Sequence, residues 1–384
     1  MMKLRTWFIL IMILGACKDK YMPHINQPAS GFLVVEGYIN SGNDSTFIYL
    51  SRSSALDSIQ VFPEPGARIE IQSEQGASYP LMEQPGGKYA VAALPIDPAQ
   101  KYRLHILTSN GKEYLSDLTE VKITPPIDSV NWKAGPDLVT IYVSTHDDLK
   151  KSIYYKWSFE ETWQYSAPYI SNYVYAPKDP NHDSTYLIPR INAGAYNTCW
   201  LTSQSSNINL GSTASLNADV ISEFPLQTIS YDGSNRLVNR YSILVKQNVL
   251  TKDAYEWEQK LRNNTEQLGS IFDAQPSETG GNLHCTTDAT EQVIGFIGCS
   301  SQTVKRIFIN RYELPNVYVT TGYEICRVDS VDKAKEAQFF TDSTYEWVID
   351  HLLEGTVIVG ATGAPRGCID CREKGGVSVK PSFW

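Results

Sequence analysis

Cysteine is the residue type with the most chemistry to offer in this chain, and Cys17 stands apart from the other six. It follows two basic residues and the apolar segment from Trp7 to Leu14. That segment is too short to span a bilayer, which takes about 20 apolar residues, but it suits an export signal, which takes about 7 to 15. Gly15 and Ala16 fit a peptidase that cuts before a lipid-modified thiol. We therefore expect a lipoprotein signal peptide over residues 1–16 and a lipid on Cys17.

The lipid would fix the protein to a membrane for good. Each buried methylene of an acyl chain contributes about 0.8 kcal/mol, so several chains together make an anchor that does not dissociate. Residues 17–30 hold two prolines and few apolar side chains, as expected of a tether. An ordinary secretory signal and a membrane-anchoring helix are the alternatives, and the small residues before Cys17 fit both poorly.

The remaining cysteines are an even set, which in an exported protein favours disulfides over free thiols. Six cysteines allow fifteen pairings, so the connectivity stays open. Cys368 and Cys371 form a Cys-x-x-Cys motif with three interpretations: structural cystines, a redox dithiol, or half of a zinc site completed near His284. The structural interpretation is favoured, because there is no second such motif and no strand-to-helix setting. The disulfide candidates are Cys199, Cys285, Cys299, Cys326, Cys368 and Cys371.

No other residue pattern predicts catalysis, a metal or a cofactor. The six histidines are scattered, without a His-x-x-x-His pair or a nucleophile-elbow serine. Glu160 and Glu161 near Trp163 resemble the makings of a sugar site, but neighbours on a strand point to opposite faces and cannot act as a pair. His146 and the two aspartates after it are best explained as a solvated turn. We therefore expect a protein that is not an enzyme.

Composition limits the partners. The net charge of -9 becomes -11 once the signal peptide with its lysine and arginine is removed. Nucleic acid and anionic membrane surfaces do not attract a protein with a net negative charge, so both are excluded as electrostatic partners. With 384 residues, 42% of them hydrophobic, the chain can fill two domain cores. The 23 tyrosines and 8 tryptophans suit strands, and contact surfaces for carbohydrate or protein, equally well.

The first half alternates as β-strands do. Residues 68–72 and 102–106 place apolar side chains at every second position, which predicts one buried and one wet face for each strand. Asn110-Gly111 predicts a tight hairpin, because both residues accept a positive φ. We expect residues 31–124 to form an N-terminal β-sandwich of immunoglobulin-like, fibronectin-like or transthyretin-like kind.

A second β-rich domain is expected over residues 125–384, because the paired prolines at 125 and 126 stiffen an extended connection. Residues 166–222 lack a clear period and predict an insertion that decorates a second sandwich. Residues 240–250 predict a strand. Residues 252–268 predict one amphipathic helix, with Trp257 and Leu261 facing the core. The fold class is thus mainly β: two sandwiches, one long insertion and one helix.

Several dispersed motifs resemble one known family. They are Leu33 to Ile39, Glu161-Thr162-Trp163, Arg240 to Gln247, Gly269 to Asp273, Gly281 to Cys285, the Cys368 and Cys371 pair, and the terminal Phe383-Trp384. In this order they are similar to the Bacteroidota lipoproteins of the domain of unknown function 4249 family. The charged run Lys18-Asp19-Lys20 also resembles the surface-export signal of some Bacteroidota lipoproteins. Such proteins are often encoded near TonB-dependent transporters, so the resemblance implies a context. It implies no activity.

The expected function follows from that context. We expect a lipid-anchored outer-membrane accessory protein, facing the cell surface rather than the periplasm, which partners a TonB-dependent transporter or holds its substrate. A surface adhesin or glycan-binding lipoprotein is the alternative, with a glycan or peptide ligand. An envelope hydrolase is a weaker third, since no acid, base or nucleophile set can be named.

Overall fold

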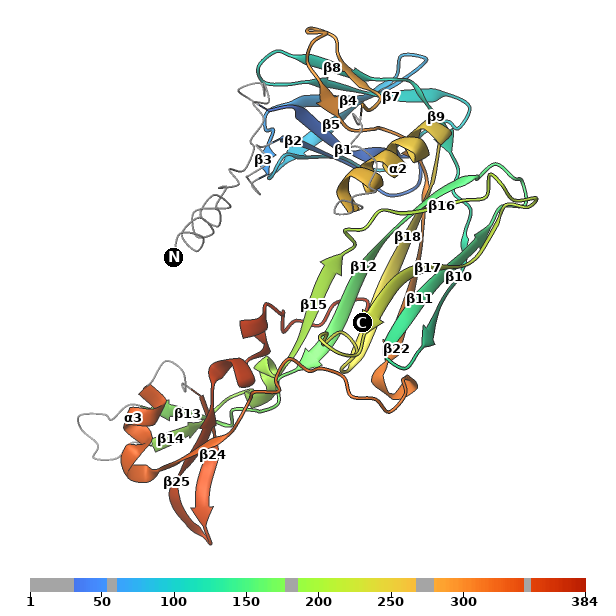
Figure 1. Cartoon of the computed structure of the whole chain (residues 1–384). Coiled ribbons are helices and arrows are strands. Elements are labelled where there is room, and N and C mark those ends of the chain that lie inside the picture. The colour runs from blue at the N-terminus through green and yellow to red at the C-terminus, as the bar shows by residue number, and fades with distance from the viewer. Residues whose placement is uncertain (1–30, 54–60, 177–185, 267–279, 342–346) are drawn as a thin grey trace, which may run out of the picture.

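The computed structural model describes residues 31–53, 61–176, 186–266, 280–341 and 347–384. The predicted signal peptide, the tether and Cys17 lie outside these residues. The prediction of a mainly β protein is confirmed, because strands make up most of the regular structure from β1 to β25. Figure 1 shows a barrel-like body at one end, a long central body, and a small lobe at the other end.

Eight strands close a hydrogen-bonded ring at the N-terminal end of the molecule (Figure 1). The ring runs β7, β4, β5, β6, β2, β1, β21, β9 and returns to β7, where Lys101 pairs with Glu120. Four short strands pair along it. The ring strands are β1 (Leu33–Asn40), β2 (Thr46–Arg52), β4 (Arg68–Ser73), β5 (Ser78–Gln84), β6 (Lys88–Val91), β7 (Lys101–Leu107), β9 (Thr119–Lys122) and β21 (Cys299–Ser300), and the added strands are β3 (Phe62–Pro63), β8 (Glu113–Ser116), β19 (Leu283–Cys285) and β20 (Val293–Ile294).

The alternation in the sequence explains the interior of this barrel. In β4 the side chains of Ile69 and Ile71 are buried, and in β7 those of Leu104 and Ile106 are buried, while their neighbours are more exposed. The inward side chains form one hydrophobic cluster, to which Tyr89 adds a fully buried ring. The prediction that residues 68–72 and 102–106 each have one buried and one more exposed face is therefore confirmed.

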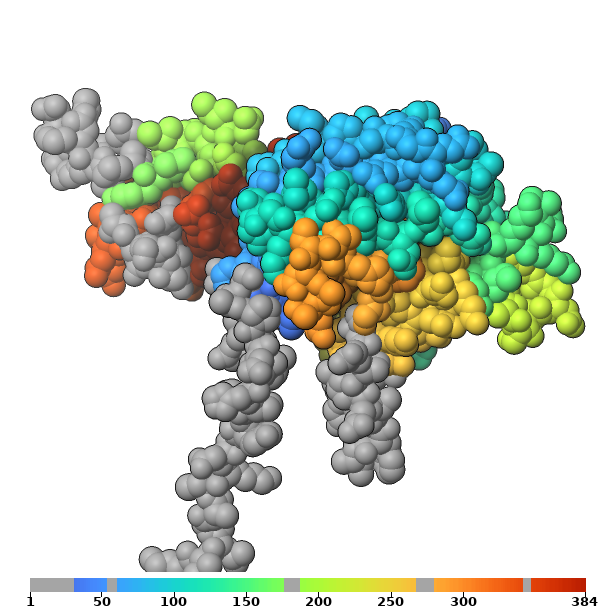
Figure 2. Space-filling model, turned by 90° about the horizontal axis from the view of Figure 1, so that it is seen from above, coloured from blue at the N-terminus to red at the C-terminus, as the bar shows by residue number. Residues whose placement is uncertain are grey.

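The ring is completed by a segment from the second half of the chain. Strand β21 lies parallel to both β1 and β9, and residues from 283 to 299 contribute side chains to the barrel core. Gly295 permits this close approach, because a Cβ there would lie 2.2 Å from the carbonyl oxygen of Val35. Figure 2 shows this orange segment lying against the cyan part of the barrel, beside the yellow part of the chain. The expected sandwich of residues 31–124 alone thus differs from the structure, because alternation identifies a buried face but not a distant pairing partner.

Two sheets build the central body over one shared core. A three-stranded sheet supplies Val139, Ile141 and Val143, and a five-stranded sheet supplies Tyr155 and Trp157, all fully buried. Strand β18 has the bounds predicted from the sequence. The first sheet holds β10 (Ile127–Ala134), β11 (Leu138–His146) and β17 (Val220–Ser230), and the second holds β12 (Tyr154–Ser166), β15 (Thr198–Gln204), β16 (Asn209–Ser212), β18 (Arg240–Leu250) and β22 (Gln302–Asn310).

Helix α2 (Lys252–Glu266) follows β18 directly and lies between the barrel and the central sheet (Figure 1). The predicted helix is confirmed over these residues, and its last two predicted positions lie outside the described part. Its face is not as expected, however. Ala254 and Glu258 are its buried residues, whereas Trp257 and Leu261 are only partly buried. The side chains predicted to face a core instead border a cleft.

The distal lobe is a small five-stranded sheet with one short helix, at the lower end of Figure 1. Strands from the predicted insertion pair here with strands near the C-terminus, since Tyr173 lies opposite Val348. The insertion therefore does not decorate one sandwich: its remaining strands, β15 and β16, join the central sheet. The lobe contains β13 (Tyr173–Ala176), β14 (Tyr186–Pro189), β23 (Asp329–Asp332), α3 (Glu336–Thr341), β24 (Trp347–Glu354) and β25 (Val357–Ala364).

Short 3-10 turns connect these elements: η2 (Ala193–Tyr196), η3 (Arg311–Glu313), η4 (Lys333–Lys335), η5 (Arg366–Cys368) and η6 (Cys371–Lys374). The last two turns place two cysteines against the central sheet. Across the described ranges, none of the helices has both the length and the apolar character needed to cross a bilayer.

Candidate functional site

A cleft of about 390 Å³ opens where the barrel, the central sheet and helix α2 meet. Ligand sites are commonly concave and occur often at the junction of two bodies, so this is the candidate site. Its walls come from segments far apart in the sequence. They include Val35, Glu36, Gly37 and Tyr38 of β1, Lys156, Trp157 and Ser158 of β12, Asn248, Val249 and Leu250 of β18, Ala254, Trp257, Glu258 and Leu261 of α2, and Phe296, Gly298, Cys299 and Ser300 of the barrel segment.

Two buried polar atoms, on residues that line this cleft, have no hydrogen-bond partner in the part of the chain that the structure describes. The Lys156 ammonium donates a hydrogen bond to Oε1 of Glu258, but Oε2 of the same carboxylate bonds nothing. Nε1 of Trp257, the preceding residue, also has no acceptor. Each unsatisfied buried group costs about 1–3 kcal/mol, and such groups are rare in folded proteins. Both atoms have almost no accessible surface, so neither is exposed to an incoming molecule.

The opposite wall is held by hydrogen bonds around Asn248. Its Nδ2 donates to Oγ of Ser300 at 3.1 Å, and its Oδ1 accepts from Nε2 of Gln302 at 3.0 Å. Burial raises the pKa of the nearby Tyr38, and the hydrogen bond with Asn248 opposes that rise only in part. The Tyr38 hydroxyl therefore stays protonated at neutral pH. This wall presents fixed, uncharged hydrogen-bonding groups.

The cleft also has an aromatic side. The ring centroids of Trp257 and Phe296 lie 6.0 Å apart with their planes inclined by 40°. Leu261, one helical turn beyond Trp257, extends the apolar surface. An aromatic pair of this kind gives a ligand a large contact area from rigid side chains.

The thiol of Cys299 lies at the cleft but is not a nucleophile. It is 2% exposed, and burial raises its pKa to about 12, so the reactive thiolate is scarce at neutral pH. Cys285 is likewise buried and unpaired, 3.4 Å from Oγ1 of Thr287. These two were predicted to form disulfides and do not. An even count cannot tell which cysteines meet, and both lie on short strands whose positions are set by the barrel.

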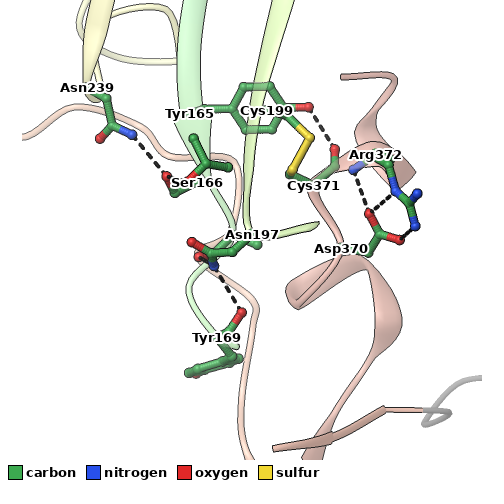
Figure 3. The surroundings of a disulfide bond; sticks show 11 residues. Tyr165, Ser166, Tyr169, Asn197, Cys199, Asn239, Asp370, Cys371 and Arg372 are labelled. Carbon is green, nitrogen blue, oxygen red and sulfur yellow. Dashed lines mark hydrogen bonds and ion pairs between the residues drawn. A yellow bond between two sulfur atoms is a disulfide. The ribbon is translucent and has the colours of Figure 1, made fainter. Parts of the chain in front are cut away.

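The other four cysteine candidates form two disulfides at the far end of the central sheet. Cys199 of β15 bonds to Cys371, and Cys326 bonds to Cys368, each with a Cα–Cα distance of 5.8 Å. Figure 3 shows the first of these bridges. Tyr165 donates from its hydroxyl to the carbonyl oxygen of Cys371 at 2.8 Å, which fixes the bridge against β12.

A buried carboxylate stands between the two bridges in the sequence. Asp370 accepts hydrogen bonds from Nε of Arg372 at 2.9 Å and from its Nη2 at 2.7 Å (Figure 3). Burial alone would raise the pKa of Asp370, but the bonds from Arg372 outweigh it and hold that pKa below its usual value. The Asp370 carboxylate is therefore charged at neutral pH.

The two cysteines of the Cys-x-x-Cys motif thus form disulfides with different partners, which agrees with the favoured structural interpretation. The redox dithiol and the half zinc site do not fit, because both sulfurs are already bonded. His284 lies elsewhere, on β19, with its Nε2 3.3 Å from Asp117. Among the described residues, no group of three or more His, Cys, Asp or Glu side chains is arranged to hold a metal ion.

Glu160 and Glu161 point to opposite faces of β12, as predicted. The Glu161 carboxylate is buried and accepts hydrogen bonds from Tyr241 at 3.0 Å and from Gln227 at 2.6 Å. On the other face, an oxygen of Glu160 lies 3.5 Å from Arg306. Glu161 therefore serves the core of the central body, and the two carboxylates share no site.

Sequence reasoning did not single out Glu258, although a signal was present. Ala254, Glu258 and Leu261 recur at helical spacing and so share a face of α2. A carboxylate on an otherwise apolar face, beside Trp257, indicates either a buried ion pair or a ligand contact. The cleft itself had no signal, because its walls come from segments whose approach only the fold determines.

Comparisons with known proteins give a family without a described activity. No curated protein matches the sequence. Among solved structures, a two-domain fibronectin type III segment of chicken tenascin matches at 9% identity and a TM-score of 0.16, covering 56% of this chain and 89% of that one. Chitinase ChiA74 from Bacillus thuringiensis matches at 15% identity and a TM-score of 0.14, covering 54% of this chain and 30% of that one.

Neither structural likeness is strong enough to support an argument about fold or function. The sequence family is a different matter, because its model matches residues 18–306, which is more than half of the chain. The chain therefore belongs to the family described as Domain of unknown function (DUF4249).

Proposed function

We propose that this protein is a lipid-anchored, non-enzymatic accessory protein of the outer membrane that holds a small ligand for a TonB-dependent transporter. The observation that carries the proposal is the cleft, which has an aromatic side at Trp257 and Phe296 and hydrogen-bonding groups around Asn248. A binding role is supported by the burial of the Cys299 thiol in this cleft, which raises its pKa and disfavours thiol chemistry there.

The membrane part of the proposal rests on the sequence. A lipid on Cys17, followed by a polar tether over residues 17–30, would keep the folded body beside a membrane of a Bacteroidota cell, on its outer surface. The acidic charge of the body keeps it from lying flat on an anionic surface. A transporter in the same membrane is then the natural partner for a protein that holds a substrate.

Lipid attachment is tested by metabolic labelling. Cells that express the full chain are grown with a radiolabelled fatty acid, and the protein is compared with a Cys17→Ala variant. We expect label on the first and none on the second. Cys285→Ala is the matched control, because it removes a cysteine that would carry no lipid. Label on the Cys17→Ala variant, or none on the unaltered chain, would overturn the anchor.

Ligand holding is tested on the full chain purified in mild detergent from its own membrane. Native mass spectrometry should detect a bound small molecule that is reduced in a Trp257→Phe variant and retained in Trp200→Phe. Chemical cross-linking in intact cells should join the unaltered chain to a TonB-dependent barrel protein. A chain without any bound molecule would remove the ligand-holding role, and cross-links that never include a barrel protein would remove the transporter partnership.

A further inference from the structure

We infer that the free edge of strand β24 in the distal lobe, over residues 350–354, is a docking site for an extended, basic segment of another protein. The segment would add a strand to the lobe sheet where β13 leaves it. The inference concerns the lobe alone and does not rest on the cleft or on the proposed ligand-holding function. It is carried by an open backbone edge, an exposed apolar tip and the pattern of charge along the strand.

The edge is open because β13 accompanies β24 only at its start. Tyr173 lies opposite Val348, and the N–H of Asn172 donates to the carbonyl oxygen of Ile349 at 3.1 Å. Beyond this point β24 pairs with β25 on its other side. On the side of β13, no strand in the described ranges pairs with residues 350–354. Extended peptides bind to sheet edges of this kind by adding a strand.

A hydrogen bond within the edge shows that a neighbouring strand is lacking. The N–H of Asp350 donates to Oγ1 of Thr362 on β25. N–H groups alternate in direction along a strand, so that of His351 points away from β25. It donates to Oδ1 of the preceding residue, Asp350, at 2.8 Å. A carbonyl oxygen of an added strand can replace this acceptor, which would leave the Asp350 carboxylate to a cation.

The tip of the β24–β25 hairpin also lacks support from other strands. Strand β23 pairs with β25 only over residues 360–363, so within the described part of the chain the hairpin from Leu352 to Val359 is two-stranded. Leu353 is 59% exposed and Val357 is 62% exposed. Figure 1 shows this tip as the lowest part of the molecule. A two-stranded hairpin is at best marginally stable in water, and a third strand would stabilise it.

The charge pattern along β24 selects the partner. Residues 350–354 pair with β25 without an extra residue in β24, so Asp350, Leu352 and Glu354 lie on one face of the sheet. Asp350 and Glu354 are exposed. Directly opposite residues on neighbouring strands attract when their charges differ in sign and repel when they agree. The edge therefore fits a segment with Lys or Arg opposite both carboxylates and an apolar residue midway between them.

A second copy of this chain fits the edge poorly. Antiparallel pairing of two β24 strands about Leu352 would set Asp350 of each copy opposite Glu354 of the other, which makes two like-charge pairs. The net charge of -9 also makes two copies repel each other. A lipid bilayer fits poorly as well, because open strand edges and carboxylates are not tolerated in hydrocarbon.

The test is fluorescence polarisation with labelled peptides and the full chain in mild detergent. The probe is a capped peptide, Thr-Lys-Val-Leu-Val-Lys-Thr, whose sequence is the same in both directions, so its lysines meet both carboxylates in a parallel or an antiparallel pairing. We expect this lysine peptide to bind at least about tenfold more tightly than its glutamate counterpart, Thr-Glu-Val-Leu-Val-Glu-Thr. N-methylation of the Val-Leu-Val backbone should abolish binding, because it removes backbone donors but keeps the charges.

Variants of the chain locate the site. Asp350→Lys combined with Glu354→Lys should reverse the preference, so that the glutamate peptide binds about tenfold more tightly than the lysine peptide. The matched control is Asp329→Lys with Asp332→Lys, on β23 at the opposite edge of the same sheet, which should leave both affinities unchanged. Should the β24 double variant fail to fold, Asp350→Asn with Glu354→Gln decides, because the two peptides should then bind equally.

A reversed preference, together with loss of binding on N-methylation, supports the inference. Failure of the lysine peptide to bind the unaltered chain overturns it, as does binding that survives N-methylation. A change of preference in the β23 control, with none in the β24 variant, places the site at the other edge and also overturns it. Analytical ultracentrifugation that finds a dimer broken by Leu353→Lys would make a second copy the occupant instead. Binding to phosphatidylcholine vesicles that Leu353→Lys abolishes would make it a lipid surface.

Discussion

The barrel and the distal lobe keep their shapes by different means. The barrel has a large hydrophobic core and two buried cysteines, Cys285 and Cys299, that stay unpaired. The lobe has a much smaller cluster, built on Val331, Phe340, Val348 and Ala361, and the segment that joins it to the central body carries both disulfides. Small cores cannot supply enough burial to be stable alone. The four bridged cysteines are buried in the core of the central body, so the covalent bonds lie at the base of the lobe, where its strands leave that core.

The barrel has ionic ties in place of covalent ones. Nε of Arg52 bonds to Glu64 at 2.7 Å, and Nη1 of the same residue lies 3.3 Å from Glu291. Glu291 also accepts from the Tyr114 hydroxyl at 2.8 Å and from Lys112. These bonds attach the late segment around residue 291 to the early strands β2 and β8. The lobe is therefore held by sulfur bridges, and the barrel closure by a buried cluster of charges.

The largest effect should come from removing the bridge between β15 and the C-terminal segment. Replacing Cys199 and Cys371 together by alanine frees a loop of 172 residues. The loop-closure model puts its contribution at about 5 kcal/mol, with engineered and native bridges commonly giving about 2–5 kcal/mol. Limited proteolysis should then cleave near the lobe first, and thermal unfolding should begin earlier.

The matched control is Cys285→Ala with Cys299→Ala, which removes two buried sulfur atoms but no bridge. It should destabilise the barrel by about 1–2 kcal/mol per site at most and leave the lobe as resistant to protease as before. Equal protease sensitivity of the lobe in both double variants would mean that the bridges do not hold it.

The second largest effect should come from Glu291→Ala in the barrel. It removes a buried acceptor from three partners and leaves Arg52 with Glu64 and the carbonyl oxygen of Gly31, which should cost about 3 kcal/mol. Chemical denaturation measures the change, and hydrogen exchange should report it first in β1 and β9. If exchange rises in the lobe instead, the two regions are not independent.

An intermediate effect is expected from acid, through Asp370. The pKa of this carboxyl is lower in the folded chain than in the unfolded one, so its charged form stabilises the fold. That contribution is fully present above the unfolded pKa of about 4 and is lost as the pH falls through the folded pKa. Thermal unfolding measured between about pH 2 and pH 6 should show less acid sensitivity in Asp370→Asn than in the unaltered chain. Parallel curves for the two proteins would contradict this assignment.

The smallest effect should come from a surface pair that belongs to neither region. Lys133 and Glu223 lie 2.6 Å apart on the three-stranded sheet, and both are about half exposed. Water and salt screen such pairs, so Lys133→Ala should leave the unfolding temperature unchanged within error. A clear loss of stability would show that exposed ion pairs contribute here as much as the buried cluster around Glu291.

Local sequence patterns predicted the parts of this fold that depend on neighbours along the chain. The alternation at 68–72 and 102–106, the strand at 240–250 and the helix from 252 all follow from periods of two or 3.6 residues. Such patterns say which face is buried. They could not predict that β21 would close the ring with β1 and β9, because pairing between distant segments leaves no periodic trace.

The candidate site shows the same limit. No sequence pattern predicted that Phe296 and Trp257 would meet, since one lies on the barrel segment and the other on α2. Trp257 was expected in a core because apolar residues at helical spacing normally are. It borders the cleft instead, because the barrel and the central sheet stay apart beside α2. The disulfide partners could not be predicted either, because six cysteines allow fifteen pairings and this fold forms two bonds.

The late closure of the ring also sets an order of events during synthesis. A ribosome makes residues up to β9 long before it makes Cys299 and Ser300 of β21, so for most of translation β1 and β9 each have an unpaired edge. Open strand edges recruit other chains. A nascent chain that stalls before residue 300 therefore cannot finish its first domain, and a fragment that ends at residue 124 should aggregate. The N-terminal body is the first to be made and among the last to be complete.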